Sequence, residues 1–149
     1  MCGIAGIISR DTSKISDAYL NSMSNAIAHR GPDGQYTWIS GDGIAGLCHR
    51  RLKIIDTSAA AAQPMHYEGG YTIIHNGEIY NYVELRDELS KAGYQFTTQS
   101  DTEVILAAYA HYKEKCVERF DGMFAFAIWS ATEQKLFCAR DRFGEKPFF

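Results

Sequence analysis

The order of the predicted elements limits the fold most, because strands come in pairs and the helices stand apart from these pairs. Strand-like patterns cover 36–40 and 44–48, joined by the turn Gly41-Asp42-Gly43, and then 123–129 and 135–139. A parallel sheet needs strands that alternate regularly with helices, and the sequence has no such alternation. We therefore expect an α+β fold with mostly antiparallel sheets.

Residues suited to helix capping place three helices outside these strand pairs. Glu84 and Glu103 each follow a candidate capping residue by three positions, as in a capping box. The helices are expected to extend from Ser16 to His29, from Asn81 to Gly93 and from Ser100 to about Lys115. Short apolar runs predict further strands over 2–9 and 71–75, and 57–65 is expected to be a loop.

Composition and charge exclude several classes of protein. The 149 residues, 46% hydrophobic and 22% charged, suit one globular domain, and a net charge of −3 argues against a nucleic-acid partner. The longest nearly unbroken apolar stretch, 122–129, is far shorter than the ~20 residues that span a bilayer, so we expect no membrane partner. No basic residue precedes Arg10, unlike in a signal peptide, so we expect a cytoplasmic location, where widely spaced cysteines stay reduced.

Cys2 has the most informative position in the chain. Removal of Met1 would leave a thiol and a free α-amino group on one residue. The pKa values of such groups are close, about 7.7–8.0 for the amine and about 8.5 for the thiol, so the amine can accept the thiol proton. The alternative is that a small buried cysteine simply begins the first strand.

Asn76-Gly77-Glu78 is expected to lie between the end of a strand and the start of a helix. The Asn76 side chain and the Gly77 N–H could then act as donors to an oxyanion, and the glycine would let a ligand approach the backbone closely. The alternative is an ordinary Asn-Gly turn.

Arg51 and Asp101 are charged residues, the first beside an apolar stretch and the second at the predicted start of a helix. Arg51 borders an apolar stretch and could hold a carboxylate through two hydrogen bonds. Asp101 could bind an ammonium group, or it could only stabilise the start of its helix through the helix dipole. One cationic and one anionic anchor suit the head group of a free amino acid.

Seven stretches, taken in order, form a specific pattern. They are Met1-Cys2-Gly3-Ile4-Ala5-Gly6, His29-Arg30-Gly31-Pro32-Asp33, Arg51-Leu52, Gln63-Pro64, Asn76-Gly77-Glu78-Ile79-Tyr80-Asn81, Ser100-Asp101-Thr102-Glu103-Val104-Ile105 and Gly122-Met123-Phe124-Ala125-Phe126-Ala127. The pattern resembles the glutaminase domain of class II glutamine amidotransferases, which are N-terminal nucleophile hydrolases, and within them the asparagine synthetase branch. The resemblance covers 1–149 and implies a four-layer αββα sandwich, in agreement with the α+β prediction.

The resemblance also implies a mechanism. Cys2 would be the nucleophile, its own amine the base, and Asn76 and Gly77 the oxyanion hole. Attack on the side-chain amide of glutamine would release ammonia and leave a γ-glutamyl thioester, which water would hydrolyse to glutamate. If Met1 stays attached, Cys2 has no free amine, and the chain would be an unprocessed form.

The same resemblance assigns the residues that bind substrate. Arg51 would bind the α-carboxylate of glutamine and Asp101 its α-ammonium, with Glu78 beside this head group. Asn76 and Gly77 would also contact the substrate. Arg30, with the turn 29–33, is expected to support the nucleophile strand from behind.

The partners implied are L-glutamine and a C-terminal synthetase domain of the same full-length chain, because 140–147 resembles the join between the two domains. We expect 1–149 to be truncated before that domain, which would use ATP and magnesium, and we expect no metal or cofactor in 1–149. The acceptor stays open between aspartate and other carboxylates, including sugar acids. Whether the chain forms a homodimer also stays open. Two other classes stay open: a non-catalytic glutamine-binding or regulatory module, and a structural or interaction domain.

Overall fold

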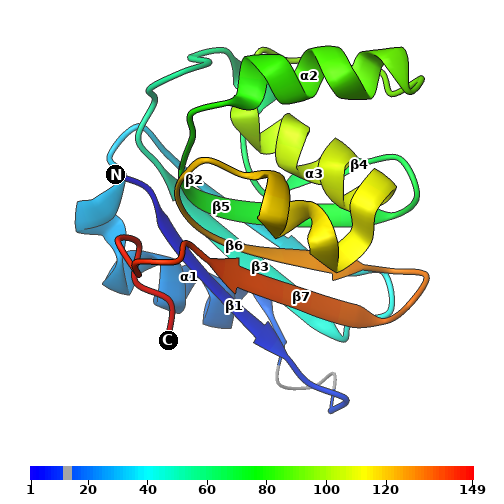
Figure 1. Cartoon of the computed structure of the whole chain (residues 1–149). Helices are drawn as coiled ribbons and strands as arrows, with labels where there is room; N and C mark the ends of the chain where they lie inside the picture. The colour runs from blue at the N-terminus through cyan, green and yellow to red at the C-terminus, as the bar shows by residue number, and fades with distance from the viewer. Residues whose placement is uncertain (12–14) are drawn as a thin grey trace.

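Two stacked antiparallel sheets form the centre of the computed structural model, which describes residues 1–11 and 15–149 (Figure 1). The first sheet, with strand order β1-β3-β2, contains β1 (Gly3–Ile8), β2 (Gly34–Ile39) and β3 (Ala45–Arg51). The second, with order β4-β5-β6-β7, contains β4 (Met65–Tyr67), β5 (Tyr71–Ile79), β6 (Gly122–Ser130) and β7 (Lys135–Arg140). Every neighbouring pair of strands is antiparallel, as predicted.

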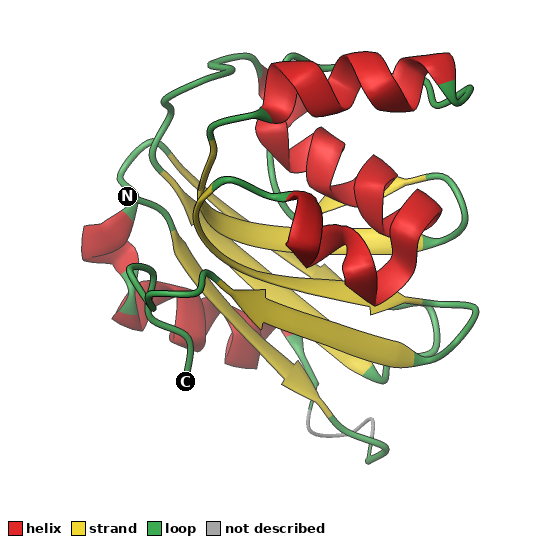
Figure 2. Ribbon diagram, in the orientation of Figure 1, coloured by secondary structure: helices red, strands yellow, loops and turns green. Residues whose placement is uncertain are grey.

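Helices cover the outer face of each sheet (Figure 2). Helix α1 (Asp17–Ala26) packs on the first sheet, and α2 (Tyr82–Lys91) and α3 (Asp101–Tyr112) lie over the second. Short 3-10 segments are η2 (Ala28–Arg30), η3 (Ala59–Ala61) and η4 (Lys113–Arg119). The predicted four-layer αββα sandwich is confirmed.

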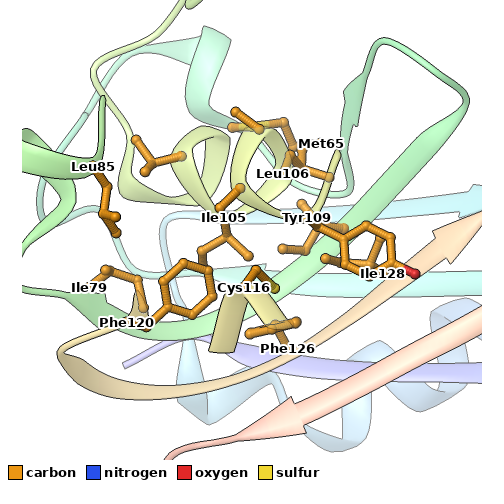
Figure 3. Packing of buried hydrophobic residues seen from close by; sticks show 14 of the residues in the cluster. Met65, Ile79, Leu85, Ile105, Leu106, Tyr109, Cys116, Phe120, Phe126 and Ile128 are labelled. Carbon is orange, nitrogen blue, oxygen red and sulfur yellow. The ribbon is translucent and has the colours of Figure 1, made fainter. Parts of the chain in front are cut away.

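Two apolar layers hold the sandwich together. The outer layer lies between the second sheet and its helices, and Figure 3 shows Ile105, Phe120 and Phe126 packed within it. The inner layer lies between the two sheets and contains the buried side chains of Leu47 and Ile74. Side chains alternate between the faces of a strand, so β5 contributes to both layers.

Strand β5 extends four residues beyond the predicted end at His75, as far as Ile79. Asn76 and Gly77 pair with Ala125 and Phe124 of β6, so they lie in the last part of the strand, ahead of α2, and the predicted strand end at His75 is wrong. An Asn-Gly pair favours a turn in isolation, but here the neighbouring β6 provides a partner along the full length of the strand. The chain turns only after Ile79.

The predicted helix caps hold at two of the three helices. The hydroxyls of Ser16 and Ser100 accept hydrogen bonds from the first turns of α1 and α3. Asn81 precedes α2 but does not cap it with its side chain. Instead its amide donates to the Arg119 carbonyl at 2.9 Å and accepts from the Asp121 N–H at 3.0 Å, so it joins α2 to the start of β6.

Glu103 does not close the predicted capping box. Its two carboxylate oxygens accept hydrogen bonds from the N–H and hydroxyl groups of Thr97 and Thr98, at 2.7–2.9 Å. These bonds fix the chain that leads into α3. Helix α3 itself ends at Tyr112, and the predicted remainder to Lys115 belongs to η4.

Two further observations bear on the class of protein. Within the described residues, no helix combines the length and apolar character needed to cross a membrane. The thiols of Cys2, Cys48, Cys116 and Cys138 are all free.

Candidate active site

A cavity of about 600 Å³, including its open mouth, lies where the start of β1 meets the ends of β3 and β5. It brings together residues that are far apart in the sequence. Six predicted site residues line it: Cys2, Arg51, Asn76, Gly77, Glu78 and Asp101.

Cys2 is half-buried immediately before β1. Its sulfur accepts a hydrogen bond from the Leu52 N–H at 3.3 Å and donates to the Leu52 carbonyl at 3.5 Å. Burial raises the pKa of the Cys2 thiol, while the Leu52 contact, the terminal ammonium and Arg51 oppose this effect. With Met1 attached, the Cys2 nitrogen is part of a peptide bond and cannot act as a base.

The edge of β5 exposes one backbone donor to the cavity. The His75 N–H donates to Gln63 Oε1 at 2.5 Å, and the Ile79 N–H donates to Asp101 Oδ2 at 3.0 Å. Alternate residues of an antiparallel strand direct their N–H groups to the same side. The Gly77 N–H therefore points between these two, away from β6 and into the cavity that Gly77 lines.

Only glycine fits at position 77. Its φ of 153° lies in a region that L-residues rarely adopt, and a Cβ there would stand 2.1 Å from the Met123 carbonyl oxygen. The close approach to β6 thus fixes the backbone that carries the donor.

The side chain of Asn76 lies on the face of β5 opposite to that of its neighbour Gly77, and it points toward the layer between the sheets. Its side chain is buried and lines the cavity, and its Oδ1 has no hydrogen-bond partner among the residues that the structure describes. The donor that this carboxamide can offer next to the Gly77 N–H is its Nδ2 amide group, not the unpaired oxygen.

Arg51 lies at the end of β3 and is buried. Its guanidinium donates to the Ser58 carbonyl at 2.8 Å and to the Asp56 carbonyl at 2.6 Å, which fixes its orientation. A guanidinium has five N–H donors, so donors remain for an anion in the cavity.

Asp101, the first residue of α3, also lines the cavity. One carboxylate oxygen holds the Ile79 N–H, and the second can take an ammonium group. Glu78 also lines the cavity and is half-buried. Side chains of opposite charge thus line one cavity, as the head group of an amino acid requires.

The structure adds buried polar residues that the sequence analysis did not assign to the site. His49 and His75 both line the cavity. Burial lowers the pKa of His49 to about 3, so its ring is neutral, and neither ring nitrogen has a hydrogen-bond partner within the described chain. Cys48, its neighbour on β3, lies outside the cavity, as the alternation of side chains on a strand requires.

Lys146 is another residue that the sequence analysis did not place in the site. The Asp141 carboxylate accepts hydrogen bonds from the backbone N–H groups of Phe143, Glu145 and Lys146, at 2.8–3.1 Å. This turn folds the stretch 141–146 back so that the buried Lys146 lines the cavity, and its ammonium contacts the sulfur of Met1. A local sequence pattern gives no sign of so distant a contact.

Arg30 does not line the cavity but lies behind β1. A Cβ on Gly3 would stand 3.0 Å from the Arg30 Cβ, so η2 packs closely on the strand that follows Cys2. In the adjoining turn the Asp33 N–H donates to the Arg51 carbonyl at 2.9 Å, and its carboxylate accepts from the Lys53 N–H at 2.9 Å. A supporting role for Arg30 remains a prediction.

Over 1–11 and 15–149, no group of three or more His, Cys, Asp and Glu side chains is placed to hold a metal ion.

Comparisons with known proteins agree on one family. A family model described as a glutamine amidotransferase domain matches residues 1–149. Asparagine synthetase [glutamine-hydrolyzing] 1 of Bacillus subtilis (strain 168) is 45% identical over 153 residues, which cover 100% of this chain and 24% of that protein. A putative asparagine synthetase [glutamine-hydrolyzing] 2 of Methanocaldococcus jannaschii is 40% identical and is covered to 32%. The chain thus spans a quarter to a third of the length of these relatives.

A solved structure shows the same fold. It is glutamine phosphoribosylpyrophosphate amidotransferase from B. subtilis, complexed with ADP and GMP, and it matches with a TM-score of 0.68. The match covers 94% of this chain and 36% of that one, at 20% sequence identity. At such low identity the likeness concerns the fold alone.

Proposed function

Since the chain belongs to the glutamine amidotransferase domain family, we propose that it hydrolyses the side-chain amide of L-glutamine through a thioester on Cys2. The observation that carries this proposal is the position of the Cys2 sulfur in one cavity with the Gly77 N–H, Arg51 and Asp101. A nucleophile, an oxyanion donor and two head-group anchors are the parts that amide hydrolysis of a free amino acid requires.

Removal of Met1 would free the Cys2 amine to take the thiol proton. The sulfur then adds to the γ-carbonyl carbon of glutamine, and the carbonyl oxygen becomes an oxyanion. When this intermediate collapses, the C–N bond breaks, and ammonia leaves with the proton that the amine returns. Water, which gives a proton to the same amine, then attacks the thioester, so that glutamate forms and the thiol is regenerated.

The enzyme would bind glutamine by its head group, and this contact would position the side-chain amide at the other end of the substrate. Arg51 takes the α-carboxylate through the donors that Ser58 and Asp56 leave unused, and Asp101 takes the α-ammonium with Glu78 beside it. The Gly77 N–H and the Asn76 carboxamide then face the oxyanion. Each such donor contributes about 2.7–4 kcal/mol when it is aimed at charge that forms in the transition state.

In the full-length protein we propose that the ammonia is used for an amide transfer, as the names of the relatives indicate for those proteins. A further domain would then activate the acceptor, which is aspartate or another carboxylate, with ATP and magnesium. The chain covers only a quarter of such relatives, so this step lies outside the residues described.

The test uses the chain after Met1 has been removed, with the new terminus verified by mass spectrometry. We expect glutamine to be converted to glutamate, and a glutamine-like electrophile, 6-diazo-5-oxo-L-norleucine, to label Cys2. Cys2→Ala should abolish both, whereas Cys138→Ala, at an exposed cysteine, should change neither. Failure of the processed chain to form glutamate or to be labelled at Cys2 would refute the proposal.

A second candidate is a glutamine-binding regulatory module without turnover. The raised pKa of Cys2 and the peptide bond at its nitrogen favour it for the unprocessed chain. It predicts that glutamine binds to the processed chain without forming glutamate, so the same experiment separates the two candidates.

A further inference from the structure

The free edge of β5 has an unusual arrangement next to Gly77. Strand β4 pairs with β5 only from Tyr71 to Ile73, so no strand formed by residues 1–11 or 15–149 covers the edge beyond that point. We propose that Gln63 is a positioning residue that replaces the missing strand at His75 and thereby holds the Gly77 N–H at the oxyanion position. The inference rests on the proposed glutaminase function and adds to it a residue with no assigned role in the reaction.

The contacts fix Gln63 at both ends of its amide. Its Oε1 accepts the His75 N–H at 2.5 Å, so its Nε2 must face the Thr102 hydroxyl, to which it donates at 3.2 Å. The same hydroxyl lies 3.1 Å from His75 Nδ1. Gln63, His75 and Thr102 thus form a closed ring of buried polar groups.

This ring lies next to Gly77 along β5. Gln63 holds the N–H two residues before Gly77, and Asp101 holds the N–H two residues after it. The donor between them is left for the substrate. Because Thr102 follows Asp101 at the start of α3, both supports are anchored to the same helix turn.

The two supports differ in what else they can do. The Asp101 carboxylate has a second oxygen for the substrate ammonium, so its replacement would disturb binding as well as geometry. Gln63 also lines the cavity, but both polar atoms of its side chain are hydrogen-bonded within the protein, so we expect it to affect where the oxyanion donor lies rather than how the head group binds. This difference allows positioning to be measured separately from substrate binding.

Gln63→Met is the decisive change, since it keeps the length of the side chain and removes both hydrogen bonds. We expect kcat for glutamine hydrolysis to fall about 10- to 100-fold, less than the 10²–10³-fold typical of removing an oxyanion donor outright. The inhibition constant of the product L-glutamate, which reports on the head-group anchors, should change less than about 3-fold. A general loosening of the site would weaken glutamate binding and kcat together.

Gln63→Glu is the matched control. It keeps an oxygen that can accept the His75 N–H, and we expect it to recover most of the lost kcat. The amide resonance of Gly77 in NMR spectra should shift in Gln63→Met and stay near its original position in Gln63→Glu, which tests the geometry even without turnover. If Gln63→Met fails to fold, Thr102→Val, with Thr102→Ser as its control, removes the other anchor of the ring and takes its place.

The inference is overturned if wild type is active but the apolar variant keeps its kcat within 2-fold, or loses glutamate affinity in proportion to kcat. An unshifted Gly77 resonance would overturn it as well. The glutaminase proposal fails separately, when processed wild type forms no glutamate or when Cys2→Ala does not abolish its formation.

Discussion

The two layers on either side of β5 differ in what fills them. The outer layer is closed by large side chains such as Ile105, Tyr109 and Phe126, which are fully buried. The inner layer is apolar only around Leu47 and Ile74, and two residues further along the same strands it contains His49 and Asn76. Much of the large apolar packing therefore lies on one side of β5, and the unpaired polar groups of His49 and Asn76 lie on the other.

The difference shows how a small domain can leave polar atoms unpaired in its interior. A buried donor or acceptor without a partner costs about 1–3 kcal/mol. The outer layer can offset that cost, since each large apolar side chain that becomes fully buried contributes about 1.5–3 kcal/mol. The inner layer can then keep its unpaired groups for a ligand.

The largest effect is expected from truncation in the outer layer. Phe126→Ala should lower the free energy of unfolding by about 3–5 kcal/mol, because it leaves a cavity among Phe120, Phe124 and Phe137. Urea denaturation followed by circular dichroism measures this loss. The same change at Phe143, which is 91% exposed, should have an effect within about 0.5 kcal/mol.

Equal losses at the two positions would contradict the comparison, because they would mean that the outer layer does not provide most of the stability. A loss at Phe126 below about 1 kcal/mol would have the same meaning, since it would show that the layer closes over the cavity.

The inner layer should respond in the opposite way, with a loss of activity and little loss of stability. Asn76→Ala is expected to lower kcat by about 10²–10³-fold, because it removes a donor to the oxyanion. The free energy of unfolding should change by less than about 1 kcal/mol, since the Oδ1 that is removed has no partner in the described structure.

Asn76→Asp sharpens this test. It keeps the shape of the side chain but replaces the donor by an oxygen, so kcat should fall about as far as in Asn76→Ala. A normal kcat in Asn76→Asp would show that Asn76 donates no hydrogen bond in the reaction.

The sequence predicts the fold where short-range patterns decide it. Alternation of side chains identified the paired strands, and Ser16 and Ser100 marked two helix starts correctly. Asn76-Gly77 was assigned to a strand end because a local pattern cannot show that β6 runs alongside. Asn81 failed as a cap for the same reason, since its partners Arg119 and Asp121 lie far along the chain.

The site divides in the same way. The motifs of the family resemblance single out Cys2, Arg51 and Asp101 from the sequence, and the structure brings all three to one cavity. Gln63 and Lys146 could not be assigned roles, because their contacts depend on how the strand edge and the stretch 141–146 meet in space. Motifs therefore identify the reacting groups more readily than the residues that position them.

A pH-dependent effect concerns the neutral histidine of the inner layer. His49 has a pKa of about 3 when folded, against an ordinary value of 6.5, so between these values the unfolded chain binds a proton that the folded chain does not. The stability that this group contributes is present above about pH 6.5 and is lost as the pH falls toward 3, by up to ~1.4 kcal/mol per pH unit. Burial also lowers the pKa of His75, which adds to the same trend.

Denaturation curves of wild type and His49→Leu between pH 7 and pH 4 isolate this contribution, because the carboxylates and His75 titrate in both proteins. As the pH falls below 6, the unfolding free energy of His49→Leu should rise relative to that of wild type by about 1.4 kcal/mol per pH unit, which is the slope for one proton. Parallel curves would mean that the folded protein gives the His49 ring a partner that keeps its pKa near 6.5. The inner layer would then hold its polar groups already paired, and the contrast with the outer layer would lie in size alone.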